Sequence, residues 1–275
     1  MTRGGTVDVL TFNLNNPGRE RAARQLAYLA ARPEPVLVLT ETANSAGCSY
    51  LEERFTAAGY SVTFPRPEQR GERGAMIVSR LATRPLPTGV DYLPHRAVGV
   101  TVDSDEGPVE VIGLYVPSRD ATEVKTDRKR AFLQQCRLNL PGSERDGHRV
   151  VLGDFNVLEP THVPRYRFFA PFEYEFYNWF EEAGYVDAFR HLHPDVLDYS
   201  WVGRTGDGYR YDHAHVTSGL ADHHLRGCAY VHEPRTMADR LTDHSGLVVE
   251  LGVRATAPLT VTDPVQAAEP VAALF

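Results

Sequence analysis

The stretch VVLGDFN, residues 150–156, is an apolar run that leads directly into an acid, an aromatic residue and an amide. A short apolar run of this kind predicts a buried β-strand. Asp154 and Asn156 then stand where the strand meets its loop. Binding sites of α/β folds gather at such strand ends, because loops there bring together side chains that are distant in sequence.

The same pattern recurs at other predicted strands along the chain. A single acid or amide beside a strand is ordinarily a turn residue, since Asp and Asn favour turns. Five segments that share the pattern instead predict one common pocket. Its candidate residues, in chain order, are Asn13 with Asn15, Glu41, Asp154 with Asn156, Asp212, and Asp243 with His244.

Apolar strand-like runs alternate with segments of helical spacing over most of the chain. Helices are predicted over residues 20–31, 49–60, 125–140 and 173–185. Strands mixed with helices in this order predict an α/β fold of two packed β-sheets with helices outside. No linker interrupts residues 6–254, so we expect one domain over 1–254. Residues 255–275 are rich in Ala, Pro and Val, which predicts a poorly ordered tail.

Composition narrows the class of protein further. The chain has 275 residues, 42% of them apolar, which allows a sizeable core. A net charge of −7 argues against nonspecific coating of nucleic acid, although a local basic groove remains compatible with it. Three cysteines without CxxC spacing indicate thiols in a reducing compartment. With neither a signal-peptide pattern nor a run of about 18 apolar residues, we expect a cytoplasmic protein without a membrane partner.

The residue types in the predicted pocket indicate its chemistry. Carboxylate and amide oxygens suit Mg²⁺ or Mn²⁺ better than zinc. A further carboxylate can activate water, and a histidine can stabilise charge on a phosphoryl group. The set therefore predicts metal-assisted hydrolysis of a phosphate ester.

Seven motifs in order resemble those of the endonuclease/exonuclease/phosphatase superfamily. They are TFNLN, LTET, GAMIVSR, GLYVPS, LGDFN, YRYDH and TDHSGLVVEL, and they span nearly the whole chain. Residues 184–201, GYVDAFRHLHPDVLDYSW, are most similar to the exonuclease III type of abasic-site endonuclease. The resemblance implies a four-layer α/β sandwich in which two mixed sheets pack face to face.

The resemblance also implies roles for individual residues. Glu41, Asn13 and Asp243 would hold the metal, with Asn15 close by. Asp154 would orient and deprotonate the attacking water, and Asn156 would hold it or the phosphate. His244 would contact the phosphate while Asp212 fixes its ring, and Tyr115 would donate a hydrogen bond to the phosphate or leaving group. The implied substrate contacts are Ser118, Arg119, Trp201, Tyr209 and Tyr211.

The chain departs from the subfamily at several of these motifs. NPGRE follows the first motif, and VPSRD follows the tyrosine, where relatives often carry an amide as phosphate contact. Tyr209 and Tyr211 flank the arginine of YRYD, where relatives place aliphatic or Trp side chains. In the DNA enzymes of the family these flanking positions help to line the pocket for a base-free sugar, so the resemblance does not determine the shape of the pocket here.

Several residues admit a purely structural interpretation. Tyr115 could be a core aromatic, and Asp212 could pair with Arg210. His213 and His215 share one strand face, and a zinc pair there is conceivable. Packing or solvent exposure is favoured, because no cysteine or third ligand is placed nearby in sequence.

The basic and aromatic segments are similarly open to two interpretations. The basic residues after the Tyr115 strand could track a DNA backbone or form a solvated helix face; they are Arg119, Lys125, Arg128, Lys129 and Arg130. The aromatic run over 166–180 could stack bases. The helical spacing of Phe176, Trp179 and Phe180 instead predicts core packing.

The hypothesis that follows is a Mg²⁺- or Mn²⁺-dependent phosphodiesterase that acts on DNA in repair, as an abasic-site endonuclease, a 3′–5′ exonuclease or both. We expect a monomer with DNA as its partner. One alternative is a phosphatase or phosphodiesterase for RNA or a small phosphate ester, and another is a non-catalytic nucleic-acid binding module. The terminal VAALF, residues 271–275, weakly resembles sliding-clamp binding peptides, although a disordered tail is the simpler interpretation.

Overall fold

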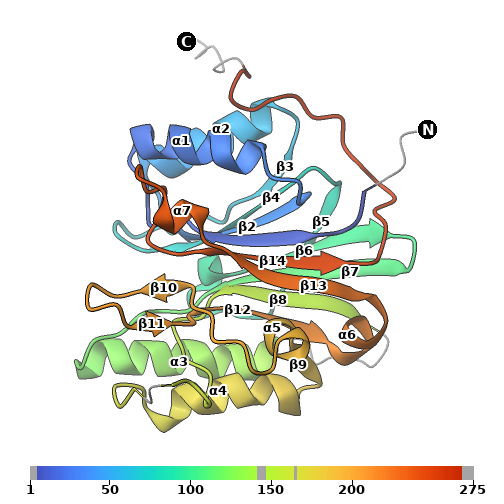
Figure 1. Cartoon of the computed structure of the whole chain (residues 1–275). Coiled ribbons are helices and arrows are strands. Elements are labelled where there is room, and N and C mark those ends of the chain that lie inside the picture. The colour runs from blue at the N-terminus through green and yellow to red at the C-terminus, as the bar shows by residue number, and fades with distance from the viewer. Residues whose placement is uncertain (1–4, 141–146, 164–165, 268–275) are drawn as a thin grey trace.

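Two six-stranded β-sheets stack face to face in the computed structural model of the chain, which describes residues 5–140, 147–163 and 166–267 (Figure 1). The predicted α/β sandwich is thereby confirmed. The first sheet has the order β13 (Leu225–Val231), β14 (Gly246–Leu251), β1 (Val9–Asn13), β2 (Val36–Thr42), β4 (Gly74–Ser79), β3 (Ser61–Thr63). The second has the order β5 (Thr83–Leu86), β6 (Ala97–Ser104), β7 (Gly107–Tyr115), β8 (His148–Asp154), β12 (Asp212–Thr217), β9 (Tyr185–Asp187).

Each sheet contains one parallel strand pair at its centre, and these pairs determine where the polar strand ends lie. In the first sheet β1 runs parallel to β2, with Asn13 beside Thr40. In the second, β7 runs parallel to β8, with Tyr115 beside Asp154. Gly113 lets the sheets approach closely at this point, because a Cβ there would lie 2.6 Å from a methyl carbon of Val38. Carboxyl ends from both sheets therefore meet at one edge of the sandwich.

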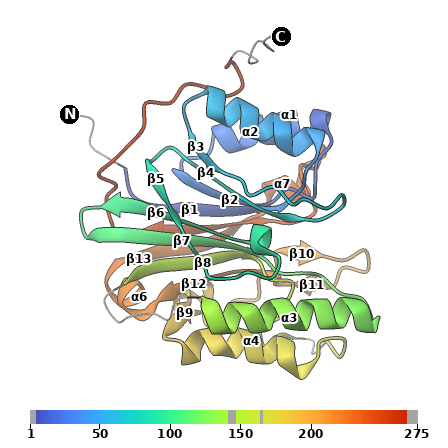
Figure 2. The same cartoon turned by 180° about the vertical axis from the view of Figure 1, so that it is seen from behind.

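Helices cover the outer face of each sheet (Figures 1 and 2). The first sheet carries α1 (Arg19–Ala30) and α2 (Ala46–Ala57), and the second carries α3 (Glu123–Asn139) and α4 (Pro171–Glu182). The shorter elements are η1 (Pro94–Arg96), α5 (Ala188–Leu192), α6 (Ser218–His224), α7 (Glu233–Thr236) and a two-stranded ribbon of β10 (Trp201–Val202) and β11 (Gly208–Tyr209). None of the described helices has both the length and the apolar character needed to cross a bilayer.

Three apolar cores hold these layers together. One lies between the sheets, one under α1 and α2, and one under α3 and α4. The third core contains Phe176 and Phe180, both fully buried, and Trp179 packs against it. Full burial of a Phe side chain stabilises the fold by about 1.5–3 kcal/mol. The aromatic residues with helical spacing thus pack in the core, as predicted.

The structure differs from the predicted poorly ordered tail over residues 255–267. This segment runs along the first sheet, where the amide of Leu259 donates to the carbonyl of Arg80 at 2.8 Å. The amide of Thr262 donates to Ala58 at 2.9 Å, and the Arg54 guanidinium donates to the carbonyl of Pro264 at 2.8 Å. Satisfied backbone groups order the segment despite its composition. Residues 268–275, which include VAALF, lie outside the described part of the chain.

A buried arginine joins three separate segments of the second sheet. Arg210 is fully buried and donates to Asp187 Oδ2 at 2.7 Å and to Glu159 Oε2 at 2.8 Å. Arg190 donates to the same Glu159 carboxylate at 2.6 Å. Asp187 and Glu159, rather than Asp212, are thus the partners of Arg210. Although burial opposes ionisation, Arg190 and Arg210 hold the pKa of Glu159 at about 2.

We expect Glu159→Gln to lower the free energy of unfolding at pH 7 by about 3 kcal/mol, because the ionised carboxylate is more stable in the folded than in the unfolded chain. This contribution is present above the unfolded pKa and is lost as pH falls toward about 2. The difference between wild type and variant, measured by urea unfolding from pH 7 to pH 3, should therefore shrink. Asp103→Asn, which breaks an exposed ion pair with Arg84, is the matched control and should leave the midpoint unchanged at pH 7. A difference that stays constant with pH would contradict the assignment.

Candidate active site

One buried hydrogen bond joins the polar ends of the two sheets. The side-chain amide of Asn13, the last residue of β1, donates from Nδ2 to Oδ2 of Asp154, the last residue of β8, at 3.0 Å. Both residues are only 1% exposed. Because a buried carboxylate without partners is costly, this contact fixes both side chains.

Further neighbours complete the surroundings of Asp154. The amide of Asn156 donates to Asp154 Oδ1 at 2.9 Å, so both carboxylate oxygens are held. Asp212 of β12 and Tyr115 of β7 lie beside Asp154 in the strand register. Burial, together with the charges of Asp212 and Glu41, raises the pKa of Asp154 well above its usual range, although His244 opposes the shift.

A buried acid–imidazole pair lies next to this carboxylate. Nδ1 of His244 is 2.7 Å from Oδ2 of Asp212, and the two residues are 6% and 1% exposed. Burial disfavours a charged ring, but the charge of Asp212 and its hydrogen bond outweigh burial, and Asp154 and Asp243 add to them. Together they raise the pKa of His244 to about 10. The ring is therefore cationic at neutral pH, with its other nitrogen free to face an anion.

Backbone conformation at the site is unusual. Of the described non-glycine residues, five have positive φ, and four of these are in the predicted pocket segments: Asn15, Asn16, Glu41 and Asn156. At Glu41 the pairing of β2 with β4 shifts register, so a bulge re-aims this side chain. Strained backbone concentrates at functional sites, where neighbouring contacts maintain it.

The remaining predicted metal ligand, Asp243, is held from two sides. Asn15 donates from Nδ2 to Asp243 Oδ1 at 2.9 Å, and Trp201 donates from Nε1 to Oδ2 at 3.1 Å. The backbone N–H of Asn15 also donates to Asn13 Oδ1 at 2.8 Å. Asn13, Glu41 and Asp243 offer only oxygen ligands, in a pocket whose buried acids exceed its one imidazolium. This donor set and excess negative charge fit a hard divalent cation whose other ligands are water and phosphate oxygens.

A cavity of about 470 Å³ lies beside His244 and Asn156. Four of the predicted substrate contacts line it, namely Ser118, Arg119, Trp201 and Tyr211. The fifth, Tyr209, stacks on Tyr211 with ring centroids 5.5 Å apart and ring planes nearly parallel. Three further aromatics line the cavity, Tyr166, Phe168 and Phe169, and they belong to the run for which the sequence left base stacking and core packing both open. Their signal was the aromatic run that begins at residue 166, whose first part faces the cavity while its second part packs in the core.

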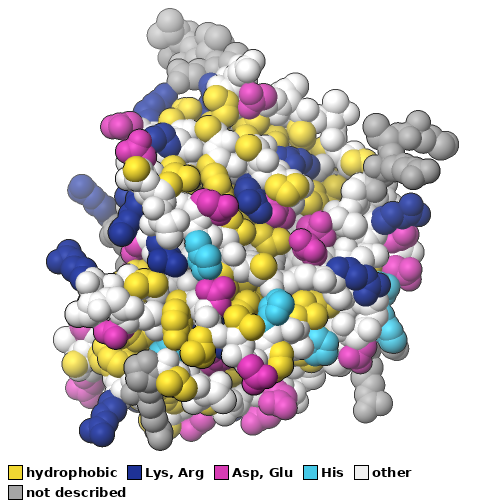
Figure 3. Space-filling model, in the orientation of Figure 1, with side chains coloured by type: hydrophobic (Ala, Val, Ile, Leu, Met, Phe, Trp, Pro, Cys, Tyr) yellow, Lys and Arg dark blue, Asp and Glu magenta, His cyan; other side chains and the backbone are white. Residues whose placement is uncertain are grey.

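The basic residues of this region are paired with acids. Arg119 and Lys129 both contact Glu173, at 2.6 and 2.7 Å, and are 7% and 1% exposed at the side chain. Lys129 also donates to the carbonyl of Asn156 at 2.5 Å, so it supports the strained residue next to Asp154. The others pair on the surface, as Lys125 with Asp120, Arg128 with Glu72 and Arg130 with Asp127. Figure 3 likewise shows acidic and basic side chains interspersed on the visible face.

The two histidines of β12 are buried. The structure places a third residue beside them, Asp187, which the sequence did not indicate. His213 and His215 are 0% and 2% exposed. Asp187 of β9 lies close enough to both that one ligand atom from each of the three residues falls within 4.8 Å of the others. Within the described residues this is the one such cluster of His, Cys, Asp or Glu, and it lies outside the predicted catalytic set.

Comparison with known proteins agrees with this architecture. The model of the Endonuclease/Exonuclease/phosphatase family matches residues 10–246. The chain is 24% identical over 211 residues to an exodeoxyribonuclease of Bacillus subtilis (strain 168), covering 72% of this chain and 82% of that protein. It is similar to an AP endonuclease from Archaeoglobus fulgidus, with 25% identity, a TM-score of 0.73 and coverage of 89% of this chain and 99% of that one. A 3′ phosphatase from Neisseria, solved with a product DNA hairpin, shares the fold at 22% identity, a TM-score of 0.72 and the same coverages.

The positive φ of Asn156 leads to a stability prediction. Asn156→Ala should be less stable than Asn156→Gly by about 1 kcal/mol, because only glycine adopts this conformation without strain. Both variants lose the hydrogen bond from Nδ2 to the carbonyl of Val116, so the difference reports on the backbone alone. Urea unfolding midpoints measure it.

The same pair of substitutions at Asn139 is the matched control. Asn139 is the last residue of α3, where alanine is the better helix former, so the order of stability should reverse. Equal or greater stability of the alanine variant at residue 156 would show that the left-handed conformation is not imposed there.

Proposed function

Because the chain belongs to the Endonuclease/Exonuclease/phosphatase family, we propose that it is a Mg²⁺- or Mn²⁺-dependent phosphodiesterase that hydrolyses DNA. The observation that carries the proposal is the juxtaposition of Asp154, held by Asn13, with the Asp212–His244 pair beside an aromatic cavity. The similarity to an exodeoxyribonuclease and to an AP endonuclease supports DNA as the substrate. Abasic-site cleavage, removal of 3′-terminal nucleotides, or both would be the activity, with a role in repair.

Asp154 is the proposed general base. Its raised pKa makes it a stronger proton acceptor than an ordinary carboxylate, and a positive charge nearby favours the ionised form that accepts. Asn13 and Asn156 hold one oxygen each, which limits the carboxylate to one orientation. Water bound against Asp154 would give up its proton as its oxygen attacks phosphorus in line.

His244 is the proposed phosphate contact. Its ring is cationic at neutral pH, because the charge of Asp212, which accepts the hydrogen bond from Nδ1–H, raises the pKa of the ring. The second nitrogen can then donate to a non-bridging phosphate oxygen and stabilise the charge that develops there. Tyr115, at the adjoining strand end and 4% exposed, would donate from its phenol to the phosphate or leaving group.

Glu41, Asn13 and Asp243 are the residues that would hold the divalent ion. When bound, such an ion supplies Lewis-acid stabilisation of phosphate charge. Asn15 contributes indirectly, because it positions both Asn13 and Asp243. The aromatic wall around Trp201 and Tyr211 would stack a nucleotide base close to the reacting phosphate, and Ser118 and Arg119, which line the same cavity, would contact the phosphate backbone.

We expect purified protein to cleave duplex DNA with an abasic site or a recessed 3′ end in Mg²⁺, and to lose this activity in EDTA. Asp154→Asn should reduce kcat about 10²- to 10⁴-fold, because it removes the base without changing side-chain size. Gel-based cleavage assays measure both effects. Asp103→Asn, an exposed acid on β6 paired with Arg84, is the control and should retain full activity.

A substrate panel tests the assignment to DNA. If the protein turns over RNA, a 3′-phosphate or a small phosphate monoester faster than DNA, hydrolysis of that substrate replaces DNA phosphodiester hydrolysis as the proposed activity. Metal-independent DNA binding without cleavage, unchanged by Asp154→Asn, would overturn catalysis and favour a binding module.

The aromatic cavity gives a separate prediction for substrate binding. Tyr211→Ala should raise KM for DNA about 5- to 100-fold and leave kcat within about threefold, because base stacking is worth about 1–3 kcal/mol and Tyr211 is not proposed to touch the reacting atoms. Steady-state kinetics separates the two constants. Tyr50→Ala on α2, on the outer face of the other sheet, should change neither. An unchanged KM in the Tyr211 variant would remove this wall from the substrate site.

A further inference from the structure

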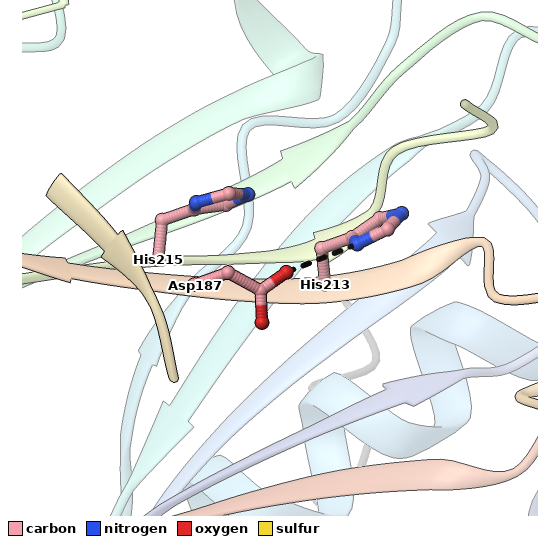
Figure 4. Close-up of side chains that lie close together, drawn as sticks. All are labelled: Asp187, His213 and His215. Carbon is pink, nitrogen blue, oxygen red and sulfur yellow. Dashed lines mark ion pairs between the residues drawn. The ribbon is translucent and has the colours of Figure 1, made fainter. Parts of the chain in front are cut away.

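Asp187, His213 and His215 form a compact cluster away from the proposed catalytic residues (Figure 4). His213 and His215 project from the same face of β12, since they are two residues apart. Asp187 of β9 is the cross-strand partner of His215 in the antiparallel register. Figure 4 shows its carboxylate between the two rings, with Oδ2 at 3.7 Å from Nδ1 of His213.

Each of the two buried imidazoles presents a nitrogen without a hydrogen-bond partner. These atoms are Nδ1 of His213 and Nε2 of His215, in side chains that are 0% and 2% exposed. The other nitrogen of His213 lies 3.0 Å from the carbonyl of Val157, which can only accept, so Nε2 carries the proton and Nδ1 presents a lone pair. A buried polar atom without a partner destabilises the fold, and two of them beside one carboxylate indicate that a ligand satisfies them.

We propose that Asp187, His213 and His215 form a transition-metal site, for which Zn²⁺ is the fitting ion. Two imidazoles and one carboxylate match a three-ligand zinc set completed by water. Tetrahedral zinc with bonds of about 2.0–2.1 Å places its ligand atoms about 3.4 Å apart. The 3.7 Å pair is already close to this separation, and the other pairs, which lie within 4.8 Å, need to contract by at most roughly 1.4 Å.

The protonation states suit metal binding. Burial, the largest cause, lowers the pKa of His215 to about 3, although Asp187 opposes the shift, so its ring is neutral at physiological pH. Burial opposes ionisation of Asp187, but the charge of Arg210 holds the pKa of this carboxyl well below its usual range. The backbone carbonyl at Val157 orients the His213 ring, as partners outside the ligand shell do in zinc proteins. Neither His215 nor Asp187 therefore has to lose a proton to bind the ion at neutral pH.

Arg210 and Tyr177 also use the Asp187 carboxylate, and the site must accommodate both. Each donates to Oδ2 at 2.7 Å. Arg210 keeps Glu159 as an anionic partner at 2.8 Å, so it remains neutralised when Oδ2 is shared with a cation. Tyr177 accepts from Arg210 at 3.0 Å and can turn its own proton away. The Tyr177 proton is thus the group that a metal ion displaces.

A cavity of about 320 Å³ gives the cluster an access route. Asp187, His215 and Tyr177 line it, together with His191 on α5. Water in this cavity supplies the fourth ligand. The ion would join β9 to β12, the strand that also begins with Asp212, but none of its ligands belongs to the proposed catalytic set.

The experiment separates this site from the proposed catalytic metal site by using Glu41→Gln protein stripped with a chelator. After equilibrium dialysis against Zn²⁺, elemental analysis should find one equivalent bound to Glu41→Gln and none to the Glu41→Gln/His215→Phe double variant. Phenylalanine preserves the stacking of residue 215 on Phe180, whose ring centroid is 4.1 Å away. A Glu41→Gln/His223→Phe protein, altered at an exposed histidine, should still bind one equivalent. Saturating Zn²⁺ should raise Tm by roughly 5 °C only in the proteins that keep His215.

Two further readouts do not require the double variant to fold. Co²⁺ added to Glu41→Gln protein should give the intense visible absorption of tetrahedral coordination, and Tyr177→Phe in that background should bind at least as tightly. Weak octahedral absorption, absence of stoichiometric Zn²⁺ in Glu41→Gln protein, equal binding by the double variant, or loss of binding on Tyr177→Phe would each overturn the proposal. Because Glu41→Gln is tested for binding alone, these outcomes are independent of whether the protein hydrolyses DNA.

Discussion

The hydrogen bond from Asn13 to Asp154 is the contact on which the rest of the site depends. It spans the interface between the two sheets and places a carboxylate where water is nearly excluded. Such a carboxylate needs fixed partners, and Asn13 and Asn156 satisfy one oxygen each. The stacking of the sheets, close enough at Gly113 to exclude a Cβ, brings these partners together. The fold and the proposed chemistry are therefore linked through one buried acid.

The side chains around this acid carry more negative than positive charge. Asp154, Asp212 and Glu41 interact across the pocket, and His244 is the cation that faces them. The backbone of the site is also strained, since Glu41 and Asn156 both have positive φ. A divalent ion would neutralise the negative charge of the acids, and a phosphate would pair with the positive charge of the imidazolium. The buried Lys129, through the carbonyl of Asn156, supports the strained segment from behind.

Much of the fold was predictable, because buried strands appear in the sequence as apolar runs and amphipathic helices as apolar residues at helical spacing. The less predictable elements are short or mixed in composition. The edge strand β13, LRGCAYV, contains a charge and a glycine, and the ribbon of β10 and β11 has two residues in each strand. Residues 255–267 resemble a tail in composition, yet backbone hydrogen bonds to Arg80 and Ala58 order them. Pairing with a neighbouring segment, rather than local propensity, forms such elements.

The sequence by itself determined the fold class and the set of polar residues at strand ends, because both follow from periodicity and from short motifs. Only the tertiary structure decided which partners those residues take. It pairs Arg210 with Asp187 and Glu159 and buries Lys129 against Glu173. It also places Asp187 beside His213 and His215. These contacts join residues far apart along the chain, and strand register and sheet stacking, which no local pattern encodes, set their distances.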